Sequence, residues 1–120
     1  MKNYKELIVW QKSIELVKKI YLLVKQFPPE EKYGLVSQIT RAAVSIPANI
    51  AEGSSRNSDK DYARFLQISL GSAFEVQTYL VIAKEMKLTK VQDIEALDII
   101  LEEVIKMIHA FIKRLLIAKS

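Results

Sequence analysis

The sequence of 120 residues contains no cysteine and one histidine, His109. Without cysteine, disulfide scaffolds, cysteine-ligated zinc, iron–sulfur clusters and thiol catalysis are excluded. A single histidine cannot build a multi-histidine metal site. The phosphate-binding patterns G-x-x-x-x-G-K and G-x-G-x-x-G are absent as well. The sequence therefore predicts a protein that is not an enzyme, with no catalytic residue, no metal and no cofactor.

Long uncharged runs are also absent. The longest stretches without Asp, Glu, Lys or Arg are ten residues each, at 42–51 and 65–74. A membrane-spanning helix needs about 20 apolar residues. The N-terminus lacks the apolar region of roughly 7–15 residues that a signal peptide carries. We expect a cytoplasmic protein that does not contact a membrane.

Glycine and proline are scarce, with three of each. Alternating strand patterns and tight hairpin signals are missing too. Apolar residues instead recur at steps of three and four, which is typical of amphipathic helices. This spacing predicts helices near 7–24, 30–52, 58–87 and 89–118, joined by short links that force neighbours to run antiparallel. The expected fold is all-α: one domain over 1–120, an up-down antiparallel four-helix bundle.

Particular residues mark the helix ends and a bend. Pro47 lies inside the second helix, where it predicts a kink, or alternatively a break, because proline cannot donate a backbone hydrogen bond. Gly53 is predicted to end that helix as a left-handed cap. Ser58, with Asp61 three residues later, is expected to cap the third helix.

The helices carry more apolar surface than one bundle needs. The first helix has a principal stripe at Leu7, Trp10, Ile14, Val17, Tyr21 and Val24, and a second at Leu16, Ile20, Leu23 and Phe27. The third helix has three stripes: Tyr62, Leu66, Ala73, Val76, Leu80 and Ala83; Ile68, Tyr79, Ile82 and Met86; Leu70, Phe74 and Val81. Large exposed apolar patches usually mark interfaces. We expect a homo-oligomer, the alternative being that two opposed faces bury within the bundle and long side chains cover the rest.

Gly71 lies in the middle of the third helix, where glycine costs about 1 kcal/mol relative to alanine. Its apolar neighbours Leu70 and Phe74 favour a site where another helix approaches closely. The small residues of the second helix at 42, 43, 48 and 51 are the expected partners. The alternative is an incidental glycine on a solvated face.

A polar stripe follows the second helix, and one carboxylate interrupts an apolar stripe of the third. The candidate structural polar network comprises Arg41, Ser45, Asn49, Glu52 and Glu75. A lone buried charge is costly, so Glu75 is expected to pair with Arg41 or to bond Asn49, fixing helix register or a contact between subunits. The alternative is that the stripe is simply solvated.

The net charge is +4, and residues 1–30 carry six Lys against three Glu. Lys5, Lys12 and Lys19 are spaced by seven, so they lie about 10 Å apart along one line of a helix. Lys18 and Lys25 flank that line. Such a row could follow a phosphate backbone. The alternative is a lysine-rich face that keeps the protein soluble.

The link after the second helix adds a second group of basic residues. Arg56 precedes the start of the third helix, where backbone donors favour anions. Lys60 and Arg64 follow on the first turns. These three residues complete the candidate nucleic-acid-binding surface.

The stretch RAAVSIPANIAEG at 41–53, with FLQISLGSAFE at 65–75, is distinctive. Together with VWQK at 9–12 and FPPEEKYGL at 27–35, it resembles a bacterial four-helix-bundle family. That family was first described from open reading frames in intervening sequences of large-subunit ribosomal RNA genes. It is often labelled a ribosomal protein, although it is not a standard ribosome component.

The family in turn resembles the accessory variability protein of diversity-generating retroelements. Those relatives form a pentameric barrel with a positively charged surface, and they bind nucleic acid and a reverse transcriptase. The resemblance implies a non-catalytic pentamer in the cytoplasm whose partners are RNA or DNA and a reverse transcriptase or other protein. Two hypotheses remain: an oligomeric accessory protein that binds structured nucleic acid, and an oligomeric protein-binding scaffold with no nucleic-acid role.

Overall fold

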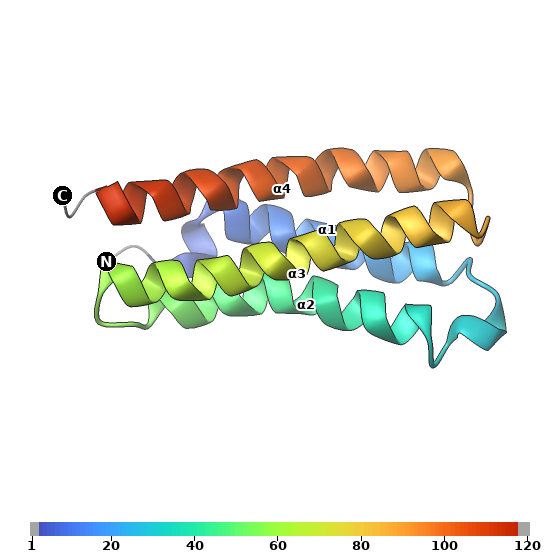
Figure 1. Ribbon diagram of the computed structural model, residues 1–120, viewed down its shortest axis with the longest axis horizontal. Helices are drawn as coiled ribbons and strands as arrows, with labels where there is room; N and C mark the ends of the chain where they lie inside the picture. Colours follow the sequence, from blue (N-terminus) through green and yellow to red (C-terminus); the bar gives the residue numbers. More distant parts are fainter. Residues whose placement is uncertain (1–2, 118–120) are drawn as a thin grey trace.

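A computed structural model describes residues 3–117, and this part of the chain contains four α-helices and no strand (Figure 1). The elements in chain order are the 3-10 turn η1 (Tyr4–Glu6), α1 (Ile8–Val24), the 3-10 turn η2 (Pro29–Glu31), α2 (Leu35–Ser54), α3 (Asp59–Glu85) and α4 (Val91–Ile117). The predicted all-α four-helix bundle is confirmed.

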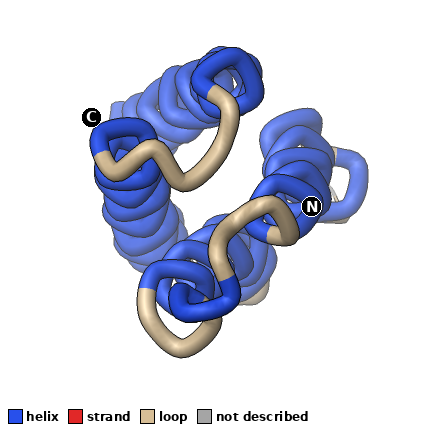
Figure 2. The backbone as a smooth tube through the Cα atoms, turned by 90° about the vertical axis from the view of Figure 1, so that its right-hand side faces the viewer, coloured by secondary structure: helices blue, strands red, loops and turns tan. Residues whose placement is uncertain are grey.

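Each helix packs against its neighbours in the chain, and α4 closes the bundle against α1. Figure 1 shows consecutive helices running in opposite directions, with the last turn of α4 and the α2–α3 link at one end of the molecule. Seen along its length in Figure 2, the bundle has its four helices around a common centre. The molecule measures 48 × 23 × 20 Å. Residues far apart in the sequence therefore share one end or one face.

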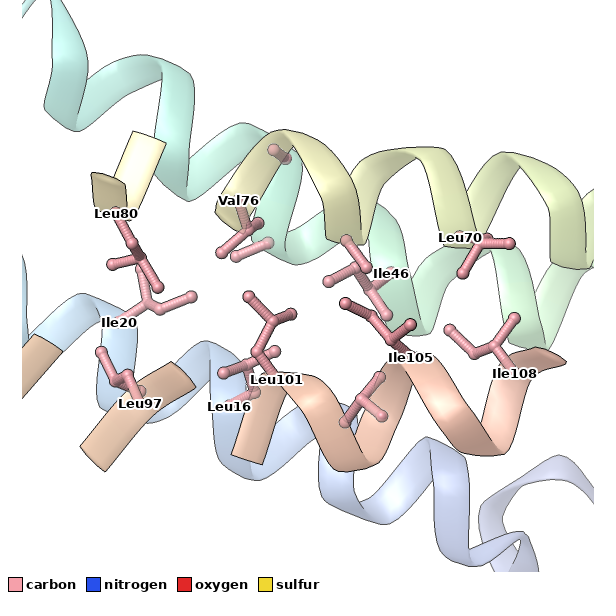
Figure 3. Packing of buried hydrophobic residues seen from close by; sticks show 14 of the residues in the cluster. Leu16, Ile20, Ile46, Leu70, Val76, Leu80, Leu97, Leu101, Ile105 and Ile108 are labelled. Atoms are coloured by element: carbon pink, nitrogen blue, oxygen red, sulfur yellow. The ribbon is translucent and has the colours of Figure 1, made fainter. Parts of the chain in front are cut away.

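The core is built from one stripe of each helix (Figure 3). The first expected stripe of α3 supplies part of it, together with buried residues of α1, α2 and α4. Its largest fully buried side chains are Leu16, Ile20, Ile39, Ile46, Ile50, Leu66, Val76, Leu80, Leu101, Val104 and Ile108. Because these aliphatic side chains leave water on folding, they supply the main stabilisation of the bundle.

The prediction for the first helix was wrong about which stripe is central. The second stripe of α1, which contains Leu16 and Ile20, is buried in the core. The principal predicted stripe lies at the edge, where Trp10 is half-buried and Tyr21 is exposed. A polar residue hid the true pattern: Ser13 occupies a core position, fully buried, and its hydroxyl donates to the carbonyl of Trp10 at 2.7 Å.

Two details of α2 also differ from expectation. The helix begins at Leu35 and not near residue 30, because Pro29 opens the separate turn η2. The helix continues through the buried Pro47, so the alternative of a break there is wrong, while the kink stays a prediction. Gly53 is not a left-handed cap: no glycine in the described chain has a positive φ, and α2 extends to Ser54.

The ends of α3 are fixed by local hydrogen bonds. The predicted cap is confirmed, since the Ser58 hydroxyl accepts from the backbone N–H of Asp61 at 3.1 Å. At the other end Lys87 adopts a left-handed conformation, with φ of 56°. The N–H of Leu88 then reaches back to the carbonyl of Ala83 at 3.0 Å, as in a Schellman motif. Lys87 thus occupies a position that glycine usually fills.

Replacing Lys87 by glycine should stabilise the bundle by about 1 kcal/mol, because a left-handed conformation is strained for any residue with a Cβ. Lys87→Ala is the matched control, since it removes the same charge but retains the strain. Urea unfolding followed by circular dichroism measures both variants. Equal stabilities for the glycine and alanine variants would show that the left-handed turn costs nothing.

Several large apolar side chains of α3 are exposed. Among the described helices, α3 is long and apolar enough to cross a membrane by length and composition, a test that core helices of soluble proteins also pass. Only 39% of its most apolar 18-residue stretch is buried. Ile68, Phe74, Val81, Ile82 and Met86 remain exposed on one chain. A single bundle therefore leaves part of the apolar surface of α3 exposed, and its burial by other copies stays a prediction.

Candidate nucleic-acid interface

Of the expected row, Lys12 and Lys19 lie on α1. Lys5 does not continue their line, because it lies in the separate turn η1 and the extended Leu7 interrupts the helix between them. Lys12 does not stand free, because its Nζ lies 2.9 Å from a carboxylate oxygen of Glu103 on α4. The hydrogen bond that Lys12 donates to Glu103, followed by the negative charge of Glu103, raises the pKa of Lys12 above the usual 10.5. Lys12 is therefore charged at neutral pH, but part of its field is neutralised by its own chain.

Lys18 and Lys25 do not lie on the same line of the helix as Lys12 and Lys19. The Nζ of Lys19 lies 4.0 Å from Glu15, one turn earlier. Since each residue turns an α-helix by about 100°, Lys18 and Lys25 point away from the row and into solvent. Neither makes an ion pair with any residue that the structure describes. The row and its predicted flanks are therefore two separate strips of α1.

The α2–α3 link brings two arginines to one aromatic ring. The guanidinium groups of Arg56 and Arg64 lie 4.3 and 4.6 Å from the ring centre of Phe65. Arg56 also pairs with Glu52 at 2.5 Å, and Arg64 pairs with Asp61 at 3.0 Å. Both arginines are thus held in place by cation–π contacts and by carboxylates.

Two basic side chains near the α2–α3 link have a nitrogen atom without a partner in the described chain. The Nε of Arg56 is buried and has no hydrogen-bond partner within the described chain. Lys60, on the first turn of α3, is exposed and makes no ion pair with residues 3–117. Lys5 lies in η1, which packs against α1 and α2.

The eight candidate basic residues therefore divide into two equal groups. Within the described residues, four of them have a carboxylate partner: Lys12, Lys19, Arg56 and Arg64. The other four make no ion pair with residues 3–117: Lys5, Lys18, Lys25 and Lys60. Surface lysines without a partner lose least when they bind a phosphate, because no internal ion pair has to be broken.

The polar residues between α2 and α3 form a smaller network than the sequence predicts. The hydroxyl of Ser72 donates to the hydroxyl of Ser45 at 2.8 Å. Asn49 donates to the same hydroxyl at 2.9 Å. Nearby, buried Ser69 donates to the carbonyl of Ile46 at 2.9 Å. These bonds fix how α2 and α3 align along their length.

Sequence reasoning missed Ser69 and Ser72. Both are buried on the face of α3 that packs against α2, and small polar residues beside a stripe of alanines were the available signal. Arg41 and Glu75 were expected in this network, but both are exposed, and the structure gives no ion pair between them within one chain. Glu52 pairs instead with Arg56.

The Lys12–Glu103 pair predicts a pH effect on stability. Because the pKa of Lys12 is raised on folding, its stabilisation is fully present below pH 10.5 and is lost as the pH rises through the folded value. At neutral pH the wild type should therefore unfold at a higher urea concentration than Glu103→Gln. This difference between the two midpoints should shrink above pH 10.5. Burial raises the pKa of Tyr62 in both proteins, so the comparison cancels its contribution. A constant difference up to strongly alkaline pH would contradict this role.

No group of three or more His, Asp or Glu side chains that could hold a metal ion occurs in the described part of the chain. His109 is exposed on α4, and its ring centre lies 6.4 Å from that of Phe74. The structure therefore offers basic and apolar surfaces as its candidate functional features.

Comparison with known proteins places the whole bundle in one family. The family model described as 23S rRNA-intervening sequence protein matches residues 5–110. A crystal structure of a protein with unknown function from the S23 ribosomal protein family of Bacteroides thetaiotaomicron is similar, with a TM-score of 0.82 and 29% sequence identity. The match covers 88% of this chain and 99% of that one. No curated protein matches the chain. The chain belongs to the family of 23S rRNA-intervening sequence proteins.

Proposed function

We propose that copies of this chain associate and that the assembly binds structured RNA or DNA through its basic surface, without catalysing a reaction, in the bacterial cytoplasm. The observation that carries nucleic-acid binding is the set of four exposed lysines that make no ion pair with residues 3–117. Repeating a weakly basic surface in an oligomer multiplies its field and its contacts. A pentameric assembly and a reverse-transcriptase partner rest on the family resemblance.

The exposed apolar residues of α3 support the self-association. Ile82 is 41% and Met86 is 65% exposed on a single chain. Soluble monomers rarely leave several large apolar side chains of one helix in water. Contacts between copies would bury them and would bring the basic strips of several chains together.

Nucleic-acid binding is tested by its dependence on salt. If about four phosphates are neutralised per chain, the affinity for a structured RNA or a DNA duplex should fall about 10²-fold between 50 and 200 mM salt. A fourfold variant with Gln at positions 5, 18, 25 and 60 should bind far more weakly and with a flatter salt dependence. Fluorescence anisotropy with a labelled hairpin RNA and a labelled DNA duplex measures both properties.

The matched control carries Gln in place of Lys84, Lys87, Lys90 and Lys106, which removes the same charge outside the proposed surface. The control should retain the wild-type salt dependence. If the control loses binding and the first variant does not, the proposed surface is wrong. Absence of binding by the wild type even at low salt would exclude the nucleic-acid role.

One observation favours the second candidate function, a protein-binding scaffold. Four of the eight candidate cations are already paired with carboxylates of the same chain, which lowers the positive field that a polyanion would meet. A scaffold would still associate through its apolar surface. The anisotropy titration separates the two functions, because a scaffold gives no binding at any salt concentration.

A further inference from the structure

We infer that the part of α1 formed by Lys18, Tyr21 and Lys25 binds an unpaired segment of nucleic acid, with a base stacked on Tyr21 and phosphates on the two lysines. We call these three residues the α1 strip. This inference rests on the proposed nucleic-acid binding and deepens it, because it names which part of a folded RNA or DNA the protein contacts.

The three side chains of the α1 strip lie on one side of the helix, and all three are exposed. Since each residue turns an α-helix by about 100°, Lys25 lies within about 20° and Tyr21 within about 60° of Lys18 around the axis. The two lysines are about 10 Å apart along the axis, and Tyr21 lies between them. A strand that runs along α1 would therefore meet a cation, an aromatic ring and a second cation in turn.

Tyr21 has no partner inside the chain that would explain its exposed ring. The side chain is 48% exposed and makes no hydrogen bond, ring contact or cation–π contact with residues 3–117. Every other aromatic side chain that is exposed or half-buried in these residues has such a partner: Tyr4, Trp10, Tyr33, Tyr62, Phe65, Phe74, Tyr79 and Phe111. The ring of Tyr21 is thus available to a ligand from outside the chain.

The positive charge of the α1 strip is not neutralised by its own helix. Lys18 and Lys25 make no ion pair with residues 3–117. No Asp or Glu occurs from residue 16 to residue 29. The preceding carboxylate on α1, Glu15, lies beside Lys19 instead, at 4.0 Å. Two free cations on either side of an exposed ring favour a polyanion over a neutral or basic partner.

The helix beside Tyr21 adds no opposing charge either. Tyr21 lies about 180° around α1 from Lys12, which pairs with Glu103, so it is turned away from α4 and its carboxylates. The other helix packed against α1 is α2, which has no Asp or Glu from residue 35 to residue 51. A polyanion can therefore approach Tyr21 without repulsion from the helix beside it.

The aromatic ring narrows the polyanion to unpaired nucleotides. Every base has a flat π-face that stacks on an aromatic side chain, whatever the sequence. In a duplex the bases stack on one another between two backbones, whereas the bases of loops, bulges and single strands can turn outward onto a protein ring. Long lysine side chains on both sides of Tyr21 can reach the phosphates that flank such a base.

Substitutions at Tyr21 test the stacking. The probes are a hairpin RNA and a hairpin DNA that carry 2-aminopurine, a fluorescent base, in the unpaired loop. Tyr21→Ala should weaken hairpin binding about 5- to 100-fold, because one base loses its stacking partner. Tyr21→Phe keeps the ring and should bind as the wild type does. The matched control is Tyr33→Ala, which removes an exposed ring outside the α1 strip and should leave binding unchanged.

Substitutions of the two lysines test the phosphate contacts separately. The double variant K18Q/K25Q should lower the slope of log affinity against log salt by about 1.4, since each phosphate contact on a single strand contributes about 0.7. At saturating protein it should still change the 2-aminopurine fluorescence, because the ring is retained. Tyr21→Ala should show the opposite combination, a wild-type slope and no fluorescence change. Far-UV circular dichroism verifies that every variant is folded.

Hairpin binding that Tyr21→Ala leaves unchanged would refute the inference, while the proposed nucleic-acid binding would stand. A blunt duplex of the stem sequence that binds as tightly as the hairpin would refute it in the same way. If light scattering shows that Tyr21→Ala lowers the mass of the wild-type particle, Tyr21 belongs to a contact between copies and the inference is wrong. A wild type that binds neither hairpin would overturn the inference and the nucleic-acid role together, whether or not it binds poly-L-glutamate, the probe for an acidic protein partner.

Discussion

Leu101→Ala should lower the free energy of unfolding by about 3–5 kcal/mol. Leu101 is fully buried on α4, and Figure 3 shows its side chain pointing into the centre of the bundle, as Leu16 of α1 and Val76 of α3 do. Truncation removes apolar contacts with several helices at once and leaves a cavity that their packed backbones cannot close. A loss of this size is a large part of the 5–15 kcal/mol that is typical of natural domains.

Ile99→Ala is the control, because Ile99 is 65% exposed on the same helix, two residues earlier. It should change the unfolding free energy by no more than about 0.5 kcal/mol. Urea unfolding followed by circular dichroism measures both variants. Similar losses for the two would mean that α4 does not present the face that the structure assigns to the core.

The second large effect is expected at Gly53, where alanine should destabilise the bundle by about 1–3 kcal/mol. A Cβ at this position would lie 2.7 Å from Cδ1 of Tyr62 and 3.0 Å from Cβ of Phe65. Helix propensity alone predicts the opposite sign, a gain of about 1 kcal/mol. The sign of the change therefore decides whether Gly53 serves the close packing of α2 against the start of α3.

Gly71→Ala is the counterpart, because it makes the same chemical change where the single chain has open space. On a single chain it should raise the unfolding free energy by up to about 1 kcal/mol. Thermal and urea unfolding give the two values. A stabilising alanine at Gly53 would contradict the close contact assigned to that position. A destabilising alanine at Gly71 would contradict the open space assigned to that one.

The sequence predicted the helices better than the faces that they bury. Helical spacing and short links were enough for four helices, because periodicity is a local property. The central stripe of α1 was missed because Ser13 interrupts it. The Ser13 hydroxyl donates to the carbonyl of Trp10 in the same helix, so the serine can be buried although a count of apolar residues does not include it. Which of two adjacent stripes faces inward depends on the other helices.

For the candidate site, too, the sequence predicted the positions of side chains on one helix but not their partners on other helices. Lysine spacing correctly placed Lys12 and Lys19 on one side of α1, but it could not show that Lys5 lies in a separate turn or that Glu103, 91 residues after Lys12, supplies its partner. The polar network was predicted through Ser45 and Asn49, whereas its partner Ser72 lies on another helix. Partners within a helix follow from sequence, and partners across the bundle need the fold.

Glycine carried the least reliable local signal. Gly53 and Gly71 were assigned from the usual roles of glycine, a left-handed cap and a close contact with α2. The close contact exists, but at Gly53, and the left-handed residue that ends a helix is Lys87. Both roles are set by packing and by the path of the chain, which a single sequence expresses weakly.

The mass of the wild-type particle in solution tests the central claim most directly, namely that the apolar residues left exposed on α3 are covered by other copies of the chain. Size-exclusion chromatography with multi-angle light scattering at micromolar concentration measures it. The account predicts a stable particle whose mass is a multiple of the 13.7 kDa chain. A particle of 13.7 kDa would contradict the claim and would leave the basic strips of α1 without the assembly that gathers them.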